Sequence, residues 1–362
     1  MIPVEKAFSG SYAQARSGFL AAAEAAGLSV DYHAHPLKGS QGEALAMDVA
    51  LDGPQAAERL LIVSSACHGV EGYCGSGVQI SALHDERWRE RLHSAGVAVA
   101  YIHALNPHGF SFDRRVTHEG VDLNRNFQDF SRPLPVNAAY RDLHPLLLPD
   151  AWPPSPDNLA ATELYIKTHG MLAWQAAITR GQHEFPQGLF FGGTAATWSN
   201  QTLRQVLRRL GAGRRRIAWI DLHTGLGPAG VGEKIFADRD DPLSLKRTRA
   251  WWGEEVTSIY DGSSTSALLT GLMWMSIYQE CPQVEYTGIA LEYGTVPVDQ
   301  VLQALRADHW MHGQPQVDPV LARQIRQQMR DAFYIDTPQW RQAIVDQAAR
   351  AMHQAVEGLT GA

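Results

Sequence analysis

Residues 60–72 read Leu60-Leu61-Ile62-Val63-Ser64-Ser65-Ala66-Cys67-His68-Gly69-Val70-Glu71-Gly72. The first four form a short, continuous apolar run, which is the pattern of a strand buried on both faces of a sheet. The strand is followed by a glycine-rich loop that carries a histidine and a glutamate three residues apart. The segment therefore predicts a central strand that ends in a polar site.

Further strands are predicted on both sides of this segment, and they alternate with helices. The strands are expected at 28–33, 44–51, 59–66, 97–103, 217–221, 234–237 and 288–292. Helices are expected at 10–27, 75–92, 158–180, 200–211, 242–260 and from the cap Thr337-Pro338 to about 357. This alternation predicts an α/β fold with a mixed, largely parallel central sheet flanked by helices.

Composition limits the class of protein. The 362 residues are 45% hydrophobic and 19% charged, and the net charge of −7 gives no electrostatic footprint for nucleic acid. There is no signal-peptide pattern, and no apolar run approaches the roughly 18 residues needed to span a bilayer. Three cysteines cannot form a disulfide framework, and an odd number argues against an oxidising compartment. We therefore predict a cytoplasmic protein without membrane or nucleic-acid partners.

A proline-rich stretch interrupts the regular pattern at about 132–156. It is expected to be irregular, either as a linker between two domains or as a long surface loop. We prefer the loop, because the motifs on either side belong to one site. The expectation is a single domain over 1–362, with this insertion and a helical C-terminal tail at about 315–362.

His68 and Glu71 are candidate metal ligands, because imidazole nitrogen and carboxylate oxygen both suit Zn²⁺. A hydrolytic zinc site needs a third protein ligand, and His223 offers one at the end of the predicted strand 217–221. Asp221 would orient a ligand or the substrate, or cap the next turn. The alternatives are a solvated glutamate on a surface loop and a core histidine satisfied by the backbone.

Three further polar groups fit the same chemistry. Asn124 and Arg125 are suited to gripping a carboxylate, and Arg115 to stabilising an oxyanion. Glu292 ends an apolar strand, where a carboxylate is costly to bury unless it has a partner or a catalytic task such as general base. The alternative for each arginine is a surface salt bridge, which we favour for Arg114, and for Glu292 a salt bridge at the sheet edge.

Taken in order, these elements resemble the carboxypeptidase A-like zinc peptidases. The most specific motif is Val121-Asp122-Leu123-Asn124-Arg125-Asn126-Phe127, preceded by Asn106-Pro107-His108-Gly109-Phe110. Phe8-Ser9-Gly10-Ser11-Tyr12 and Glu184-Phe185-Pro186-Gln187-Gly188-Leu189-Phe190-Phe191-Gly192-Gly193 further resemble a bacterial branch catalogued as a domain of unknown function.

The resemblance implies a phosphorylase/hydrolase-like fold with one Zn²⁺ per chain on His68, Glu71 and His223. It implies that Glu292 is the general base and acid, and that Arg115 binds the oxyanion. Asn124 and Arg125 would bind the terminal carboxylate of the substrate. Asp122 would hold His68 in the right tautomer.

The sequence also departs from the family pattern. The family's mobile active-site tyrosine has no match, with Tyr260, Tyr278 and Tyr286 as candidates that are otherwise core residues. The specificity pocket is expected between Trp252 and Tyr286. The segment 184–193 is expected to be structural, with His183 or Gln187 contacting substrate as the alternative. Cys67 is expected to be a small buried residue.

The leading functional hypothesis is a metallocarboxypeptidase that removes a C-terminal amino acid by metal-activated water. The alternative is an aspartoacylase-like deacylase of small N-acyl amino acids, which would use the same site. Either substrate carries a free carboxylate. A third hypothesis is a metal-free, inactive binding module that kept the fold. The sequence leaves side-chain preference and oligomeric state open.

Overall fold

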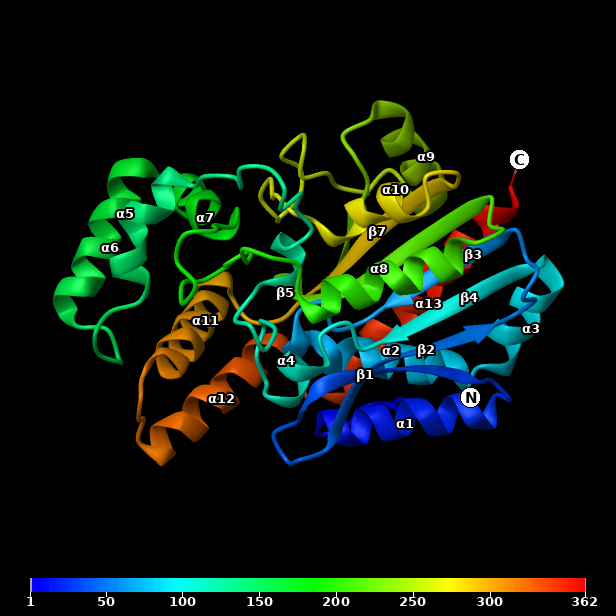
Figure 1. The fold of residues 1–362 in the computed structure, drawn as a ribbon, viewed down its shortest axis with the longest axis horizontal. Coiled ribbons are helices and arrows are strands. Elements are labelled where there is room, and N and C mark those ends of the chain that lie inside the picture. The colour runs from blue at the N-terminus through cyan, green and yellow to red at the C-terminus, as the bar shows by residue number, and fades with distance from the viewer. Residues whose placement is uncertain (1, 362) are drawn as a thin grey trace.

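A seven-stranded sheet forms the centre of the protein in a computed structural model that describes residues 2–361 (Figure 1). The strands are β1 (Val30–Lys38), β2 (Ala44–Asp52), β3 (Arg59–Ser64), β4 (Val97–His103), β5 (Arg216–Ala229), β6 (Gly232–Phe236) and β7 (Glu285–Gly294), in the order β1-β2-β4-β3-β5-β7-β6. The four central strands β4, β3, β5 and β7 are parallel, and the outer strands are antiparallel to their neighbours. The predicted mixed, largely parallel sheet is confirmed.

The two faces of β3 explain why its sequence is apolar throughout. Leu61 and Val63 pack into the core on one face of the sheet, and Leu60 and Ile62 into the core on the other. All four side chains are fully buried. Successive side chains of a strand point to opposite faces, so a strand covered on both sides must be apolar at every position.

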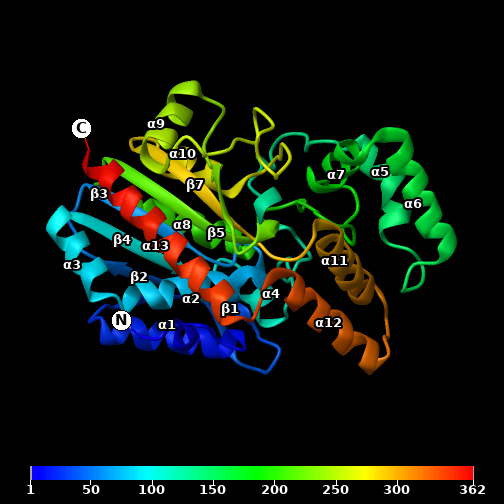
Figure 2. The same ribbon diagram turned by 180° about the vertical axis from the view of Figure 1, so that it is seen from behind.

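Helices cover both faces. On one face lie α1 (Tyr12–Ala25), α2 (Gly72–Leu83), α3 (Glu86–Ala95) and the long α13 (Pro338–Thr360), with α9 (Pro242–Trp252) packed against α13 (Figure 2). The other face carries α8 (Trp198–Gly211) and the short α10 (Ile277–Glu280). No helix within residues 2–361 is both long and apolar enough to cross a membrane.

Two of the predicted helices are each divided into two, and a third ends earlier than the apolar pattern suggested. The stretch 75–92 is two helices, because the Asp85 side chain accepts hydrogen bonds from the backbone of α3 and starts a new helix there. The stretch 158–180 divides at Gly170, where φ is 87°, into α6 (Pro156–His169) and α7 (Met171–Thr179). Helix α9 stops before Gly253, whose φ of 103° is outside the helical range.

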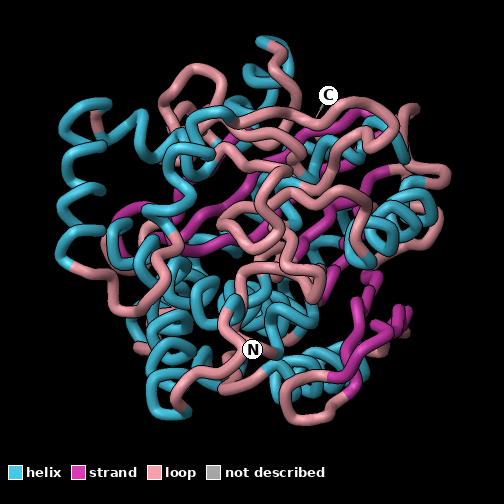
Figure 3. Tube along the Cα trace, turned by 60° about the vertical axis from the view of Figure 1, so that its left-hand side comes forward, coloured by secondary structure: helices cyan, strands magenta, loops and turns pink. Residues whose placement is uncertain are grey.

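The proline-rich stretch is not irregular throughout, which corrects the prediction. Residues Ala138–Leu147 form helix α5, which begins where the Asn137 side chain accepts a hydrogen bond from the Tyr140 backbone. Most of the prolines lie outside this helix, and only Pro145 is inside it. Helices α5, α6 and α7 form a lobe beyond the carboxyl ends of the central strands (Figure 1). Loops gather over the same strand ends in Figure 3.

The predicted C-terminal tail is helical, but its last helix is part of the main body. Helices α11 (Val298–Gly313) and α12 (Pro319–Phe333) lead from β7 to α13. The Trp340 indole of α13 donates to the Gly294 carbonyl at 3.0 Å, and the Tyr293 hydroxyl donates to the Ile344 carbonyl at 3.1 Å. Residue 362 lies outside the described residues.

The glycines beside His68 and Glu71 are required by close packing. Gly72 has a helical φ of −58°, so its backbone conformation does not itself require glycine. A Cβ on Gly69 would lie 2.1 Å from the carbonyl carbon of Gly109, and one on Gly72 would lie 2.4 Å from the Phe110 ring. The Asn-Pro-His-Gly-Phe motif forms the short helix α4 (Pro107–Ser111). The turn Gly69–Glu71, which carries Glu71, packs against this helix.

Replacing Gly69 with alanine is expected to destabilise the fold by about 3 kcal/mol, because the new methyl group collides with backbone that cannot move aside. Urea unfolding of Gly69→Ala and the wild type measures the change. The matched control is Gly313→Ala, where a Cβ meets nothing within 4 Å. Equal urea midpoints for Gly69→Ala and wild type would contradict the close packing described above.

Candidate metal and catalytic site

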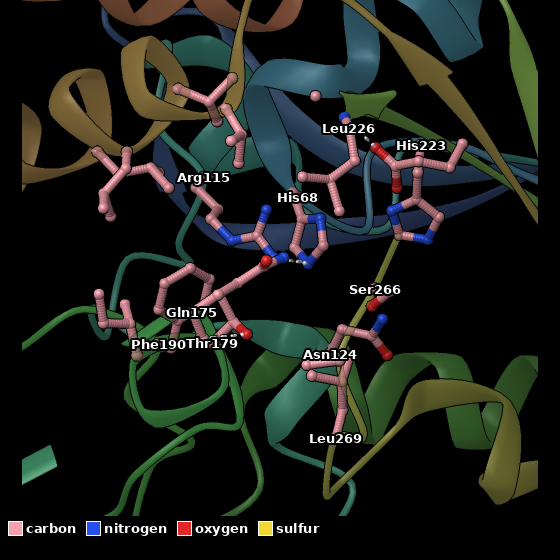
Figure 4. Close-up of a pocket in the computed structure, with 18 of the residues that line it drawn as sticks. His68, Arg115, Asn124, Gln175, Thr179, Phe190, His223, Leu226, Ser266 and Leu269 are labelled. Carbon is pink, nitrogen blue, oxygen red and sulfur yellow. Dashed lines mark hydrogen bonds between the residues drawn. The ribbon is translucent and has the colours of Figure 1, made fainter. Parts of the chain in front are cut away.

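The three predicted metal ligands come together at the carboxyl ends of β3 and β5. His68, Glu71 and His223 are buried, and one potential ligand atom from each lies within 4.8 Å of the others. His68 Nδ1 is 2.9 Å from Glu71 Oε1, and His223 Nδ1 is 3.1 Å from Glu71 Oε2. Both imidazole rings therefore turn the same nitrogen towards one carboxylate. Figure 4 shows the two rings beside each other in the cavity.

The outward nitrogens of both rings face carboxylates. His68 Nε2 lies 3.3 Å from Asp122 Oδ1, and His223 Nε2 lies 2.6 Å from Asp221 Oδ2. Asp221 is fixed in turn, because its other oxygen accepts a 2.5 Å hydrogen bond from Ser64. At His223, the carboxylate behind the imidazole places the proton on the outer nitrogen and leaves the inner one free to bind a metal. At His68, the outer nitrogen also lies 2.8 Å from Nη2 of Arg115. The sequence left two roles open for Asp221, namely orienting a ligand or the substrate and capping the next turn. Its contact with His223 Nε2 matches the first of these roles.

The charges of the cluster fit a bound cation. Burial opposes ionisation of Glu71, yet the two histidines hold its pKa below the ordinary value. Burial likewise opposes the charged form of His223, but Asp221 and Glu71 raise its pKa well above the ordinary value. Several buried carboxylates thus meet at two imidazoles, and such a set is stabilised by added positive charge. Two nitrogens and a carboxylate are also the donor set of hydrolytic zinc sites.

A second group of potential ligands overlaps the first. Cys67, Asp221 and His223 also offer ligand atoms within 4.8 Å of one another. Both oxygens of Asp221 already accept hydrogen bonds, from Ser64 and His223. Burial and the neighbouring carboxylates raise the pKa of the Cys67 thiol well above its ordinary value, which disfavours the thiolate that binds metals. The set of His68, Glu71 and His223 is therefore the better candidate.

Arg115 and Glu292 lie beside the candidate ligands. Arg115 donates to Asp122 at 2.9 Å and to Glu71 at 3.3 Å, so its guanidinium is held against the cluster. Glu292 pairs with His223 across β7 and β5, and its Oε1 accepts a 3.0 Å hydrogen bond from the Leu226 backbone. Burial and the Glu71 carboxylate raise the pKa of Glu292 to about 8. A cation bound nearby would lower it again.

The neighbouring Arg114 does make a salt bridge, with Asp308 at 3.0 Å, but not on the surface as predicted. Both side chains are largely buried, with 12% and 2% of their surface exposed. The pair ties the loop that follows α4 to helix α11.

Asn124 and Arg125 also reach the cavity, held in place by backbone contacts. The Asn124 side-chain oxygen accepts a 2.8 Å hydrogen bond from the Met273 backbone, which leaves its amide nitrogen to meet a ligand. Arg125 donates twice to the Thr179 carbonyl and once to the Asn124 carbonyl. These three bonds leave two of the five guanidinium N–H groups, one on each terminal nitrogen. Two such donors match a carboxylate.

Phe190 is a cavity residue that the sequence did not identify as functional. Its ring lies 5.2 Å from the guanidinium carbon of Arg115 and 5.5 Å from that of Arg125. The glycines around it make room for Arg125, since a Cβ on Gly181 or Gly192 would lie within 2.8 Å of that residue. The Gly-rich composition of 184–193 was the available signal, although it does not reveal which neighbour needs the space.

The other candidates of that segment lie outside the cavity lining. His183 Nδ1 lies 2.7 Å from the Gly193 carbonyl oxygen, and the Gln187 carbonyl faces His309. Of the residues described, no tyrosine lines the cavity. The hydroxyl groups of Tyr260 and Tyr278 bond to Asp238, and that of Tyr286 to Ala237, as core residues do.

All of the predicted site residues except Asp122 line one cavity of about 290 Å³. Part of its wall comes from the predicted specificity region, including Ile259, Leu269 and Trp274. Another part, which the sequence did not predict, comes from helices α6, α7 and α11. These helices contribute Ile166, Trp174, Ile178, Val301, Leu302 and Leu305.

Comparisons with known proteins agree with this architecture. The family described as "Protein of unknown function (DUF2817)" matches residues 8–347. A search of curated proteins found no significant match. Among solved structures, carboxypeptidase A from Helicoverpa armigera matches with a TM-score of 0.52 and 11% identity over 97% of this chain and 74% of its own.

Two further structures are similar at lower scores. Bovine thrombin-activatable fibrinolysis inhibitor, solved with a tick carboxypeptidase inhibitor, has a TM-score of 0.47 and 12% identity, over 97% of this chain and 98% of its own. A succinylglutamate desuccinylase/aspartoacylase from Rhodobacter sphaeroides has a TM-score of 0.36 and 13% identity, over 79% of this chain and 65% of its own. The fold is of the zinc carboxypeptidase type, as the sequence resemblance implied.

Proposed function

We propose that this chain, which belongs to the DUF2817 family, is a zinc-dependent hydrolase that cleaves an amide bond next to a free carboxylate. The best-supported activity is that of a metallocarboxypeptidase acting on short peptides. The observation that carries the proposal is the convergence of His68, Glu71 and His223 with Glu292 and Arg115 on one cavity.

Each residue has a task that its surroundings suit. A zinc ion on His68, Glu71 and His223 would supply the positive charge that polarises the amide carbonyl and acidifies water. Glu292 takes the proton from the attacking water and passes it to the leaving amine. Arg115 stabilises the negative charge that develops on the carbonyl oxygen. Asn124 and Arg125 bind the carboxylate and so fix which bond is presented.

The same machinery would also cleave a small N-acyl amino acid. The specific observation in favour of this second candidate is that the lobe covers the cavity. Gln175 of α7 donates a 3.2 Å hydrogen bond to the Thr265 carbonyl of the facing loop. A covered cavity admits a small amide more readily than a folded protein or a long peptide.

The proposal is tested by assaying zinc-loaded protein on N-blocked dipeptides and N-acyl amino acids, before and after treatment with a zinc chelator. Hydrolysis that disappears on chelation and returns with added zinc is expected. Faster turnover of N-acyl amino acids would make the second candidate the main activity. Absence of bound zinc and of chelator-sensitive hydrolysis would instead favour an inactive binding module.

Two sequence predictions remain part of this proposal. We place residues 1–362 in one catalytic domain, and we place the protein in the cytoplasm. The three cysteines are all free and buried, as befits a reducing compartment.

Replacing Asp221 with asparagine is expected to weaken zinc binding about 10- to 100-fold, because an amide no longer holds His223 in the tautomer whose inner nitrogen binds metal. Competition with a chromophoric chelator measures the affinity. Asp240→Asn, a change at an exposed carboxylate, is the matched control. If both variants bind zinc as the wild type does, Asp221 does not orient a metal ligand.

A further inference from the structure

The cavity continues past the metal-ligand cluster into an apolar compartment under the lobe. Its walls include Ile166, Trp174, Ile178, Val301, Leu302 and Leu305, which come from α6, α7 and α11. We call this space the side chamber. At its mouth lie Met171 and Val298, which also line the cavity although 58% and 52% of their surfaces are exposed. Large apolar side chains left open to solvent beside an apolar cavity indicate the entrance for an apolar ligand.

The lobe that covers the side chamber is attached by buried arginines. Arg306 of α11 donates to the Leu147 and Leu146 carbonyls of α5 at 2.8 and 2.7 Å, and to the Asn158 side chain of α6 at 3.0 Å. Arg125 holds the end of α7 through the Thr179 carbonyl. These hydrogen bonds hold the helices that line the side chamber against the rest of the protein. The side chamber is therefore a fixed part of the site.

The α11 wall of the side chamber and Asn124 lie on different sides of the metal cluster, whereas the α7 wall reaches Arg125, which donates to the Thr179 carbonyl at the end of α7. Asn124 is tied to the loop around Met273, and a Cβ on Gly271 would lie 2.2 Å from the Arg125 carbonyl oxygen. Glu292 is tied to Leu226, on the side of α11. In Figure 4, Asn124 and Leu226 lie on opposite sides of the two histidines, and α11 lies beyond Arg115. A substrate whose carboxylate is at Asn124 and Arg125 therefore extends its acyl side towards α11.

The side chamber offers more to an apolar acyl group than to an acidic one. Its basic side chain is Arg306, which makes four hydrogen bonds to protein groups and so has one of five N–H donors left. Asp299, exposed at the mouth, adds negative charge. A carboxylate placed here would be desolvated with a single N–H donor of Arg306 to meet it, whereas an alkyl or aromatic group would gain from burial against the apolar walls.

We propose that the side chamber binds a large apolar group on the acyl side of the scissile amide. This inference rests on the proposed function, whose site it extends. Two substrates carry that chemistry: an N-acyl amino acid with a medium or long alkyl chain, and a short peptide with a large apolar residue before the last.

A chain-length series tests the proposal. The substrates are the N-acetyl, N-butanoyl, N-hexanoyl and N-octanoyl derivatives of leucine, with N-succinyl-leucine and the blocked dipeptides acetyl-Gly-Leu and acetyl-Phe-Leu. We expect kcat/KM to rise about threefold per methylene until the chamber is full, and succinyl to fall below butanoyl. Whichever of octanoyl-leucine and acetyl-Phe-Leu has the higher kcat/KM then shows whether the apolar group belongs to an N-acyl amino acid or to a short peptide. A flat series, or succinyl above butanoyl, overturns the proposal.

A variant whose larger side chain fills the side chamber provides a second test. Leu302→Trp is expected to abolish the gain from octanoyl over acetyl, so that the ratio of kcat/KM for the two substrates falls to about one, whatever the rate of the variant on acetyl-leucine. Leu172→Trp, an equal change on α7 at a side chain that is 83% exposed and outside the cavity lining, is the matched control. Unchanged chain-length preference in Leu302→Trp would contradict the assignment.

Direct binding separates this inference from the proposed function. Octanoate is titrated calorimetrically into zinc-supplemented wild type, Leu302→Trp and Leu172→Trp. Binding that weakens at least tenfold only in Leu302→Trp supports the side chamber, even if no amide is hydrolysed and the proposed function fails. No octanoate binding together with hydrolysis of acetyl-leucine would overturn the chamber and leave the hydrolase intact.

Discussion

Replacing Glu292 with glutamine is expected to lower kcat about a thousandfold and to leave the zinc content unchanged. Glutamine keeps the size of the side chain and the hydrogen bond from the Leu226 backbone, but it cannot accept a proton from water. Loss of a positioned general base typically slows a reaction 10²- to 10⁴-fold, and Glu292 serves in both proton transfers. The measurement is steady-state kinetics on the best substrate, with zinc quantified in the same preparation.

The control for this variant is Glu285→Gln, an equal change at the exposed start of the same strand, β7. Its kcat is expected to match that of the wild type. If Glu292→Gln keeps more than a tenth of wild-type kcat with zinc bound, another group is the base and the proposed role of Glu292 is wrong.

Replacing His223 with glutamine is expected to remove both the zinc and the activity. The variant keeps a polar group beside Asp221 but lacks the imidazole nitrogen that faces Glu71 at 3.1 Å. Losing one of three protein ligands is expected to weaken binding by more than the 10- to 100-fold typical of losing a group that only orients a ligand. Zinc per chain after dialysis, with circular dichroism to confirm folding, measures the effect.

His169→Gln, at the exposed end of α6, is the matched control and should retain one zinc per chain. A folded His223→Gln that also retains one zinc per chain would show that the metal is held elsewhere.

That His68, His223 and Glu292 lie together could be predicted from the sequence, because they follow strands with clear apolar patterns. His68 and His223 come after apolar runs that fill neighbouring parallel strands, so their carboxyl ends had to meet at one edge of the sheet. Glu292 follows the same rule on β7. The hydrogen-bond register then places it opposite His223, a pairing that a sequence pattern alone does not give.

What the sequence could not predict depends on contacts between distant segments. The sequence around Gly69 does not indicate that this residue packs against the backbone of Gly109. The stretch 132–156 appeared irregular because prolines surround α5, and the cap at Asn137 was overlooked. The side chamber requires α7 and α11 to meet over the cavity. Their apolar residues appear in the sequence only as ordinary core positions.

The central claim is that His68, Glu71 and His223 bind zinc, and crystallography of zinc-loaded protein with anomalous scattering at the zinc edge tests it most directly. The account predicts one peak per chain, about 2.0–2.2 Å from Nδ1 of both histidines and from a Glu71 oxygen. A peak about 2.3 Å from the Cys67 sulfur, in the overlapping set with Asp221, would contradict it, as would no peak at either set.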